Sequence, residues 1–350
     1  MVPEVDLSLD PAVPGATRPS TGNGRLVAET TRLARHPVVD LVGRRLLLAV
    51  PLLFAVSALS FLLLSLAPGD AANQILGPHA TPEQYAALRR ELGLDLPVYE
   101  QYWHWLRHAL TGDLGTSIVT GQAVTQAIWE RLPVTVSLIV ASLLVTVVVG
   151  GGMGVFSAIR GGRAGRVADG LALVGFSLPA FWVGAELIVL FAVKLTWFPA
   201  TGYVPISQSP VDWLRSLVLP VIALSLYGIA ATAKQTREAM LDALASEHIR
   251  MAWANGLPAR SIFFRHALRN ASIPVVTVLG LVAVALLGGT LFVENVFALP
   301  GLGSLVVNGA IQGDLPVVQG VAVTFTLVVV LVNLLIDLAY SWLNPKVRVR

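Results

Sequence analysis

The sequence predicts an all-α integral membrane protein with six transmembrane helices. Hydrophobic residues make up 55% of the 350 residues and charged residues only 13%, which is about half of the charged share in a soluble domain. The apolar residues lie in continuous runs, close to the ~20 residues that a helix needs to cross a bilayer. Because these runs do not alternate with polar residues, and because lipid cannot hydrogen-bond an open backbone, we expect helices rather than β-strands.

The six predicted spans are joined by connections of very different lengths. They are expected at about residues 46–66, 134–159, 167–193, 217–233, 273–293 and 317–343. The fourth span is the shortest, and Pro179 in the third and Pro220 in the fourth predict kinks. Residues 1–40 are rich in Pro, Ser, Thr and Gly and are expected to form a disordered tail. Residues 41–350 are expected to form a single membrane domain.

The distribution of basic residues predicts the orientation of the spans. Eighteen of the 24 lysines and arginines lie in the two termini and in the loops at 160–166 and 234–272, and six lie on the opposite side. Since cytoplasmic loops carry the excess of Lys and Arg, both termini and the long loop are expected in the cytoplasm, with the chain in the plasma membrane. The net charge of only +3 gives no indication of nucleic-acid binding, and the absence of cysteine excludes disulfides and thiolate chemistry.

The first outer loop, residues 68–131, is long enough for a small helical layer. Thr81 reads as an N-cap that precedes Pro82 at the first helical position, so a helix to about Leu92 is expected. Residues 99–110 form an aromatic, amphipathic helix pattern that suits the membrane–water boundary. Two histidines of this pattern, His104 and His108, are four residues apart, but a metal site needs three or four converging ligands and none is predicted.

The loop at 234–272 is the most informative segment of the chain. Membrane proteins usually join adjacent spans by short loops, whereas this loop is long, basic and helix-prone. Residues 237–255 follow a helical pattern, Gly256 and Pro258 break it, and residues 258–270 resume it as a short basic helix. Such an element can either dock a partner or rest on anionic lipid, and the residue types alone leave both possibilities open.

Two further features lie within the predicted spans. Glu186 is expected to face the bundle interior or a water-filled cavity, because a charge at mid-bilayer costs about 2.5–3.5 kcal/mol. It could contact a cationic group of a transported solute, or it could be a protonated or hydrogen-bonded helix contact. Gly150 and Gly154 form a G-x-x-x-G pattern, which favours close helix packing within the chain or against a partner subunit.

Several separated motifs resemble those of the permease subunits of ABC importers, specifically the dipeptide/oligopeptide, nickel and glutathione family. In that family the long loop carries a motif idealised as Glu-Ala-Ala, three residues and Gly. The matching residues here are Arg250, Met251, Ala252 and Gly256, with Arg in the place of Glu, as in the peptide branch. Further similar segments are residues 67–70, 91–95, 112–115, 266–280, 294–303, 316–320 and 333–337.

The resemblance extends from about residue 42 to the C-terminus and implies a type I ABC importer permease. The loop at 234–272 would form the coupling helices that sit in a groove of the ATP-hydrolysing subunit, through Arg250, Met251, Ala252 and Gly256. The implied partners are a second homologous permease subunit, two ATP-binding subunits and an extracytoplasmic solute-binding protein. The residues expected to shape the pathway or its outer gate are Glu294, Phe297, Pro300, Gly301 and Gly303, with Glu186 added because of its depth alone.

The sequence contains no motif for chemistry of its own. It has neither the phosphate-binding loop G-x-x-x-x-G-K-[ST] nor the nucleophile motif G-x-S-x-G, so no enzyme activity and no cofactor are predicted. The expected cargo is a di- or oligopeptide, with nickel, glutathione or an oligosaccharide as alternatives. A stand-alone secondary transporter is the rival interpretation, but it should show an inverted repeat and paired intramembrane charges. A membrane anchor or receptor would explain the loop but not the outer motifs.

Overall fold

The chain folds into a bundle of long helices with short helices at both ends. A computed structural model describes residues 37–66, 71–77, 80–91 and 93–343. The long elements are α1 (Pro37–Ser65), α5 (Val124–Val145), α7 (Gly162–Ser177), α9 (Pro210–Ala245), α12 (Leu268–Val296) and α14 (Leu315–Leu343), and α6 (Gly151–Arg160) belongs to the same span as α5. The short ones are α2 (Ala71–Leu76), α3 (Pro82–Glu91), α4 (Val98–Leu110), α8 (Ala180–Leu187), α10 (Glu247–Ala254), α11 (Ala259–Ser261) and α13 (Leu302–Ile311). Three π-helical segments continue their neighbours, namely η1 (Thr146–Gly150), η2 (Ile188–Lys194) and η3 (Ile262–Ala267).

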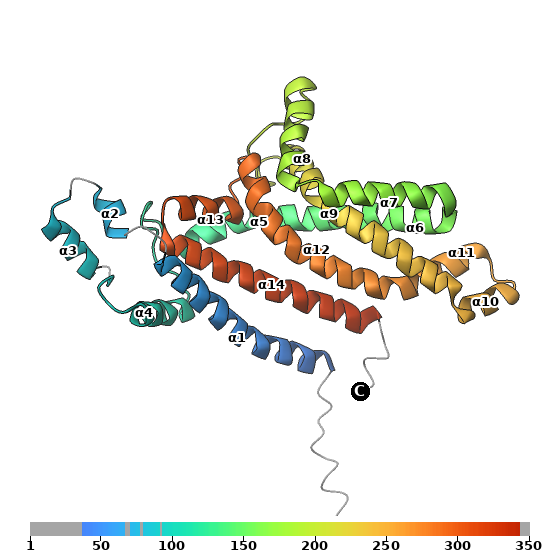
Figure 1. Cartoon of the computed structure of the whole chain (residues 1–350), viewed down its shortest axis with the longest axis horizontal. Coiled ribbons are helices and arrows are strands. Elements are labelled where there is room, and N and C mark those ends of the chain that lie inside the picture. Colours follow the sequence, from blue (N-terminus) through green and yellow to red (C-terminus); the bar gives the residue numbers. More distant parts are fainter. Residues whose placement is uncertain (1–36, 67–70, 78–79, 92, 344–350) are drawn as a thin grey trace, which may run out of the picture.

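The two ends of the body carry different short helices. Figure 1 shows α2, α3, α4 and α13 at one end and α10 with α11 at the other. The start of α1 and the end of α14 lie toward the α10 end. No strand is formed by the described residues, whose single bridge joins Thr116 to Ala123, so the all-α class is confirmed. All but the last four residues of the predicted tail lie outside the described residues.

The long apolar helices overlap five of the six predicted spans. By length and composition, the candidates for crossing a membrane are Val42–Ser65, Val124–Arg160, Pro210–Ala245, Ala259–Val296 and Leu315–Ser341. The prediction that the fourth span is short is wrong, since α9 has 36 residues and continues through Pro220. Hydropathy marks only the apolar middle of such a helix. Its start is set by Ser209, whose Oγ accepts a hydrogen bond from the Asp212 N–H at 3.2 Å, and Pro210 follows at the first helical position.

The third predicted span is a broken pair rather than one kinked helix. The segments Gly165–Ser177 and Ala180–Lys194 meet at an angle of 96°. Pro179 has no N–H to continue the helix and forces the preceding Leu178 into the extended region, at φ −93° and ψ 120°. Figure 1 shows α8 projecting sideways from the body. The position of the proline was therefore informative, but its effect is larger than the predicted kink.

The core is organised around α9, which is the most deeply enclosed of the long helices. In its most apolar window 67% of the residues are buried, against 11% for α1 and for α14. A Cβ atom added to Gly150 would lie 2.9 Å from the Ile229 carbonyl oxygen, and one added to Gly154 would lie 2.5 Å from Thr236 Cβ. The G-x-x-x-G pattern thus brings η1 and α6 against α9, which confirms the close packing within the chain.

Polar contacts join α14 to α1 and cap the start of α3. Gln319 of α14 donates from Nε2 to the Ser57 carbonyl of α1 at 2.8 Å. The predicted cap of α3 is confirmed as a capping box, since the Gln84 N–H donates to Thr81 Oγ1 at 3.3 Å and the Thr81 N–H donates to Gln84 Oε1 at 3.0 Å. The aromatic helix predicted at 99–110 is α4.

Candidate functional site

The first candidate site is the loop element, which we define as residues 246–267. The prediction of one helix over residues 237–255 is wrong, because α9 ends at Ala245 and α10 begins at Glu247. Ser246 between them is extended, at φ −70° and ψ 152°, and its hydroxyl donates to the Ala243 carbonyl. Serine competes for backbone hydrogen bonds in this way, which favours helix ends over helix interiors.

The turn after α10 depends on Gly256, as predicted. Its φ of +74° lies in the left-handed region, which favours glycine. The Gly256 N–H donates to the Trp253 carbonyl at 3.0 Å and the Leu257 N–H to the Ala252 carbonyl at 3.2 Å. This pair of bonds is the Schellman arrangement, which satisfies the last carbonyls of a helix. The turn therefore fixes where α10 stops and where the chain turns back.

The two faces of α10 have different surroundings. Ile249 and Ala252 are buried against Ile262 of η3, whereas Met251 is 63% exposed and Trp253 is 48% exposed. Burial of the inner face seats α10 on the start of the next long helix. The exposed face of α10 carries the two large apolar side chains, and this short helix lies at the very end of the body.

The predicted coupling residues divide between these two faces. Arg250 and Met251 are exposed, Ala252 faces inward and Gly256 forms the turn. Ala252 therefore packs within the chain instead of presenting itself to a partner. Trp253 is absent from the predicted set, although a large aromatic residue two positions after Met251 in an amphipathic helix was a signal available in the sequence.

The loop element is continuous with two long helices. Only Ser246 separates α10 from α9. On the other side the predicted short basic helix begins after Pro258, but it is not a separate element, because Ala259–Val296 is a single apolar helical segment. The Trp253 and Phe263 rings pack edge to face across the turn, with centroids 6.3 Å apart. α10 is thus connected closely to both α9 and α12, which pack against each other.

The second candidate site is the outer turn, residues 294–304, which joins α12 to α13 at the opposite end of the body (Figure 1). Glu294 is fully buried there. Its Oε1 accepts from Thr135 Oγ1 at 2.7 Å, and its Oε2 accepts from the Ser304 N–H at 2.9 Å. Thr135 Oγ1 in turn accepts from the Leu302 N–H at 2.8 Å. One carboxylate thus joins α12, α13 and α5, which gives it a structural role.

The glycines of the outer turn make room for this carboxylate. A Cβ atom added to Gly301 would lie 2.2 Å from Glu294 Cδ, and one added to Gly303 would lie 2.8 Å from Leu291 Cα. Phe297 is buried against α8, where a Cβ atom on Gly184 would lie 2.9 Å from Phe297 Cε2.

Of the residues predicted for an outer gate, four are thus brought together in a tightly packed turn, and two lie at the surface. Pro300 belongs to the same turn but is exposed. Glu186 is exposed on α8, so it does not face the interior of this chain's own bundle, and its location in a water-filled cavity stays a prediction. The segment after Pro179 packs one side of α8, with Val183 and Leu187, against the core formed with α9 and α12, and Glu186 lies on the side left exposed. The described residues include no group of three or more His, Asp or Glu side chains arranged to hold a metal ion.

Two family models match the chain between residues 38 and 349, with a gap at residues 140–146. Residues 147–349 match the model described as binding-protein-dependent transport system inner membrane component. Residues 38–139 match the model for the N-terminal part of a binding-protein-dependent transport system membrane component.

Similar proteins align over nearly their whole length. A putative peptide transport system permease protein of Brucella abortus is 43% identical over 309 residues, which cover 88% of this chain and 98% of the relative. A probable peptide ABC transporter permease protein of Sinorhizobium fredii is 40% identical over 87% of this chain and 98% of its own length. A glutathione transport system permease protein of Salmonella choleraesuis is 38% identical over 89% of this chain and 99% of its own.

Proposed function

Because the chain belongs to the family of binding-protein-dependent transport system inner membrane components, we propose that it forms half of the translocation pathway of an ATP-driven importer for di- or oligopeptides. ATP hydrolysis takes place on a partner chain, and no bond is broken by this one. The observation that carries the proposal is the loop element, whose exposed Met251 and Trp253 stand on a helix joined directly to α9 and, through its turn, to the segment that contains α12.

The partners are inferred from the exposed apolar side chains of the loop element, which the described part of the chain does not cover. Met251 and Trp253 are large apolar side chains on an eight-residue helix that cannot bury them within the chain. Exposed apolar groups of this kind favour docking to another protein. We assign the ATP-binding subunits to this face, a second homologous permease to the opposite half of the pathway, and a solute-binding protein to the end formed by α2, α3, α4 and α13. The α10 end and both termini are cytoplasmic.

Coupling works as a rigid-body transmission. When ATP draws the two ATP-binding subunits together, each pulls on one α10, and the Schellman turn at Gly256 keeps α10 in a fixed orientation relative to α12. The buried contacts of Ile249 and Ala252 with Ile262 keep the inner face of α10 seated during the movement. The tilt of α9 and α12 then opens the pathway to one side of the membrane and closes it to the other. The coupling residues are Arg250, Met251 and Gly256, with Trp253 added.

Peptide is the preferred cargo because relatives named as peptide permeases share 40–43% of their residues with this chain, against 38% for the glutathione permease. The difference is small, and glutathione is itself a short peptide-like molecule. We therefore assign the class of short peptides and treat glutathione, nickel and oligosaccharide as outcomes to be measured.

Reconstitution tests this function. The tagged chain is purified from its own membranes in mild detergent, the co-purifying subunits are identified by mass spectrometry, and the complex is placed in lipid vesicles. We expect ATP-dependent uptake of a labelled tripeptide supplied on its binding protein. An ionophore that collapses proton gradients should leave this uptake unchanged. Uptake by the purified chain alone, driven by a proton gradient, would instead establish the secondary-transporter interpretation.

A further inference from the structure

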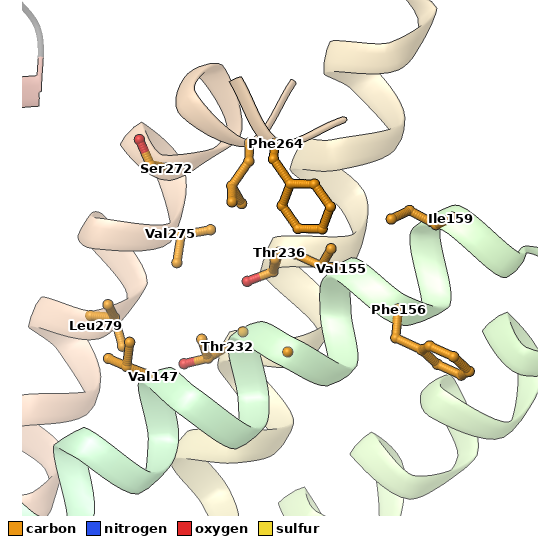
Figure 2. Close-up of a pocket in the computed structure, with 13 residues that line it drawn as sticks. Val147, Val155, Phe156, Ile159, Thr232, Thr236, Phe264, Ser272, Val275 and Leu279 are labelled. Carbon is orange, nitrogen blue, oxygen red and sulfur yellow. The ribbon is translucent and has the colours of Figure 1, made fainter. Parts of the chain in front are cut away.

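A crevice of about 600 Å³ lies between three long elements of the body (Figure 2). One side is formed by η1 and α6, another by η3 and α12, and the floor is formed by α9. None of the thirteen residues that line it is charged. Phe264 is 55% exposed and Gly152 is also exposed, so the crevice opens on the surface of the body.

The crevice has the length of one leaflet of a bilayer. Val147 and Ile159 line it along η1 and α6, and at 1.5 Å per residue they are about 18 Å apart along the helix axis. The hydrocarbon core of a bilayer is about 30 Å thick, so that one leaflet contributes about 15 Å. A spanning helix of a second subunit would extend through both leaflets, about 30 Å, and so well beyond the crevice.

Two basic residues are sequence neighbours of lining residues at one end of the crevice. Arg265 and Arg269 directly follow the lining residues Phe264 and Leu268, at the end of the body that carries α10. Both arginines are exposed, and neither has a carboxylate partner within the described part of the chain. An anionic group is the natural complement of two such guanidinium groups.

Two buried hydroxyl groups line the floor of the crevice without a partner. Thr232 is fully buried and Thr236 is 2% exposed, and neither Oγ1 has a hydrogen-bond partner among the residues that the structure describes. Figure 2 shows both side chains between the α6 and α12 walls, with Thr236 the nearer to Phe264. Both oxygens are buried beneath the surface of the crevice, so they offer no donor to a group that enters it.

We propose that the crevice holds one acyl chain of an anionic phospholipid from the leaflet on the α10 side. The phosphate lies beside Arg265 and Arg269, and the acyl chain continues along the crevice from Phe264 toward Val147. A transported peptide fits less well, because no charged side chain lines the crevice to meet its termini. The proposal does not depend on which solute the importer carries.

Photoreactive lipids test this site in the assembled complex. The complex is placed in phosphatidylcholine vesicles that contain a minor share of phosphatidylglycerol with a diazirine on its acyl chain, and the labelled peptides are mapped after irradiation. We expect labelling of residues 147–159 and 264–279 by phosphatidylglycerol in clear excess over diazirine-bearing phosphatidylcholine. Equal labelling by the two lipids would overturn the assignment of an anionic headgroup.

The proposed headgroup contacts are tested by variants in which two arginines are replaced by glutamine. Two basic residues near the cytoplasmic leaflet contribute enough to lower lipid affinity about thirtyfold when both are neutralised. The double variant Arg265→Gln/Arg269→Gln is therefore expected to lose the preference for phosphatidylglycerol. The control Arg163→Gln/Arg166→Gln removes the same charge from α7 and should keep it. Equal losses in both variants would show nonspecific attraction and contradict a site.

The acyl chain is tested by filling the crevice. A Cβ atom on Gly152 would meet no other atom within 4 Å, so that Gly152→Leu fits without a clash and occupies the crevice. We expect it to abolish crevice labelling, whereas Gly170→Leu, equally free of neighbours but on α7, should not. Unchanged labelling in Gly152→Leu would contradict the proposal. So would a cross-link from Gly152→Cys to another subunit or to a bound peptide.

Discussion

Replacing Gly256 by valine is expected to abolish uptake while the chain still inserts into the membrane. A β-branched residue in the left-handed region costs about 1–2 kcal/mol or more, and a helix of eight residues has little stability of its own to offset this. Because a Cβ atom on Gly256 would meet nothing within 4 Å, the effect acts through the backbone and not through a clash. The measurement is ATP-dependent uptake in reconstituted vesicles, alongside the amount of chain in the membrane.

The chain contains a matched control at its other end. α4 also ends in a Schellman arrangement, in which the Gly112 N–H donates to the Ala109 carbonyl at 3.0 Å and the Asp113 N–H to the His108 carbonyl at 3.1 Å. Gly112 has a φ of +88° and no neighbour within 4 Å of an added Cβ atom. Gly112→Val carries the same kind of strain, but should leave the ATP-binding subunits attached and their ATPase activity coupled to the permease. Normal uptake by Gly256→Val would remove the coupling role from the loop element.

Removing the carboxylate of Glu294 is expected to produce the largest loss of stability. In Glu294→Ala the Thr135 hydroxyl and the Ser304 N–H lose their acceptor while remaining buried. Each such group costs about 1–3 kcal/mol, so the total is about 2–6 kcal/mol. The thermal unfolding midpoint of the purified complex, followed by tryptophan fluorescence, measures this effect.

A surface glutamate of the neighbouring helix provides the comparison. Glu130 of α5 is exposed and accepts hydrogen bonds from Gln122 and Gln126 at 3.0 and 2.8 Å. Surface substitutions of this type usually change stability by no more than about 0.5 kcal/mol, so Glu130→Ala should unfold at nearly the wild-type temperature. If Glu294→Ala also unfolded at that temperature, the outer turn would not be held by its carboxylate.

Much of the fold could be predicted because membrane burial acts on long, continuous segments. The apolar runs indicated five spans directly, and Gly256 was identifiable because few residues other than glycine tolerate its backbone conformation. The helix ends were harder to predict. α9 extends beyond its apolar run in both directions, and the segment that begins at Ala259 continues without interruption into α12. Hydropathy does not show where a helix ends once it continues beyond its apolar run into water.

The parts of the sites that could not be predicted depend on tertiary contacts. A motif identifies Ala252 but does not tell whether it faces a partner or, as observed, packs beside Ile262. α8 packs on α9 and α12 with one side and leaves Glu186 on its exposed side, and proline alone does not determine whether a helix bends slightly or turns through 96°. The close contact between the Glu294 carboxylate and Gly301 forms only when the turn is folded, so the sequence does not show it.

The most direct test of the central claim uses the fact that the chain has no cysteine. Met251 is 63% exposed on α10, whereas the adjacent Ala252 is 8% exposed. In the assembled complex, a cysteine-specific photo-cross-linker on Met251→Cys should attach to an ATP-binding subunit in high yield, and the same reagent on Ala252→Cys should not. Labelling of Met251→Cys in intact cells by a membrane-impermeant reagent, without any cross-link to an ATP-binding subunit, would contradict the account.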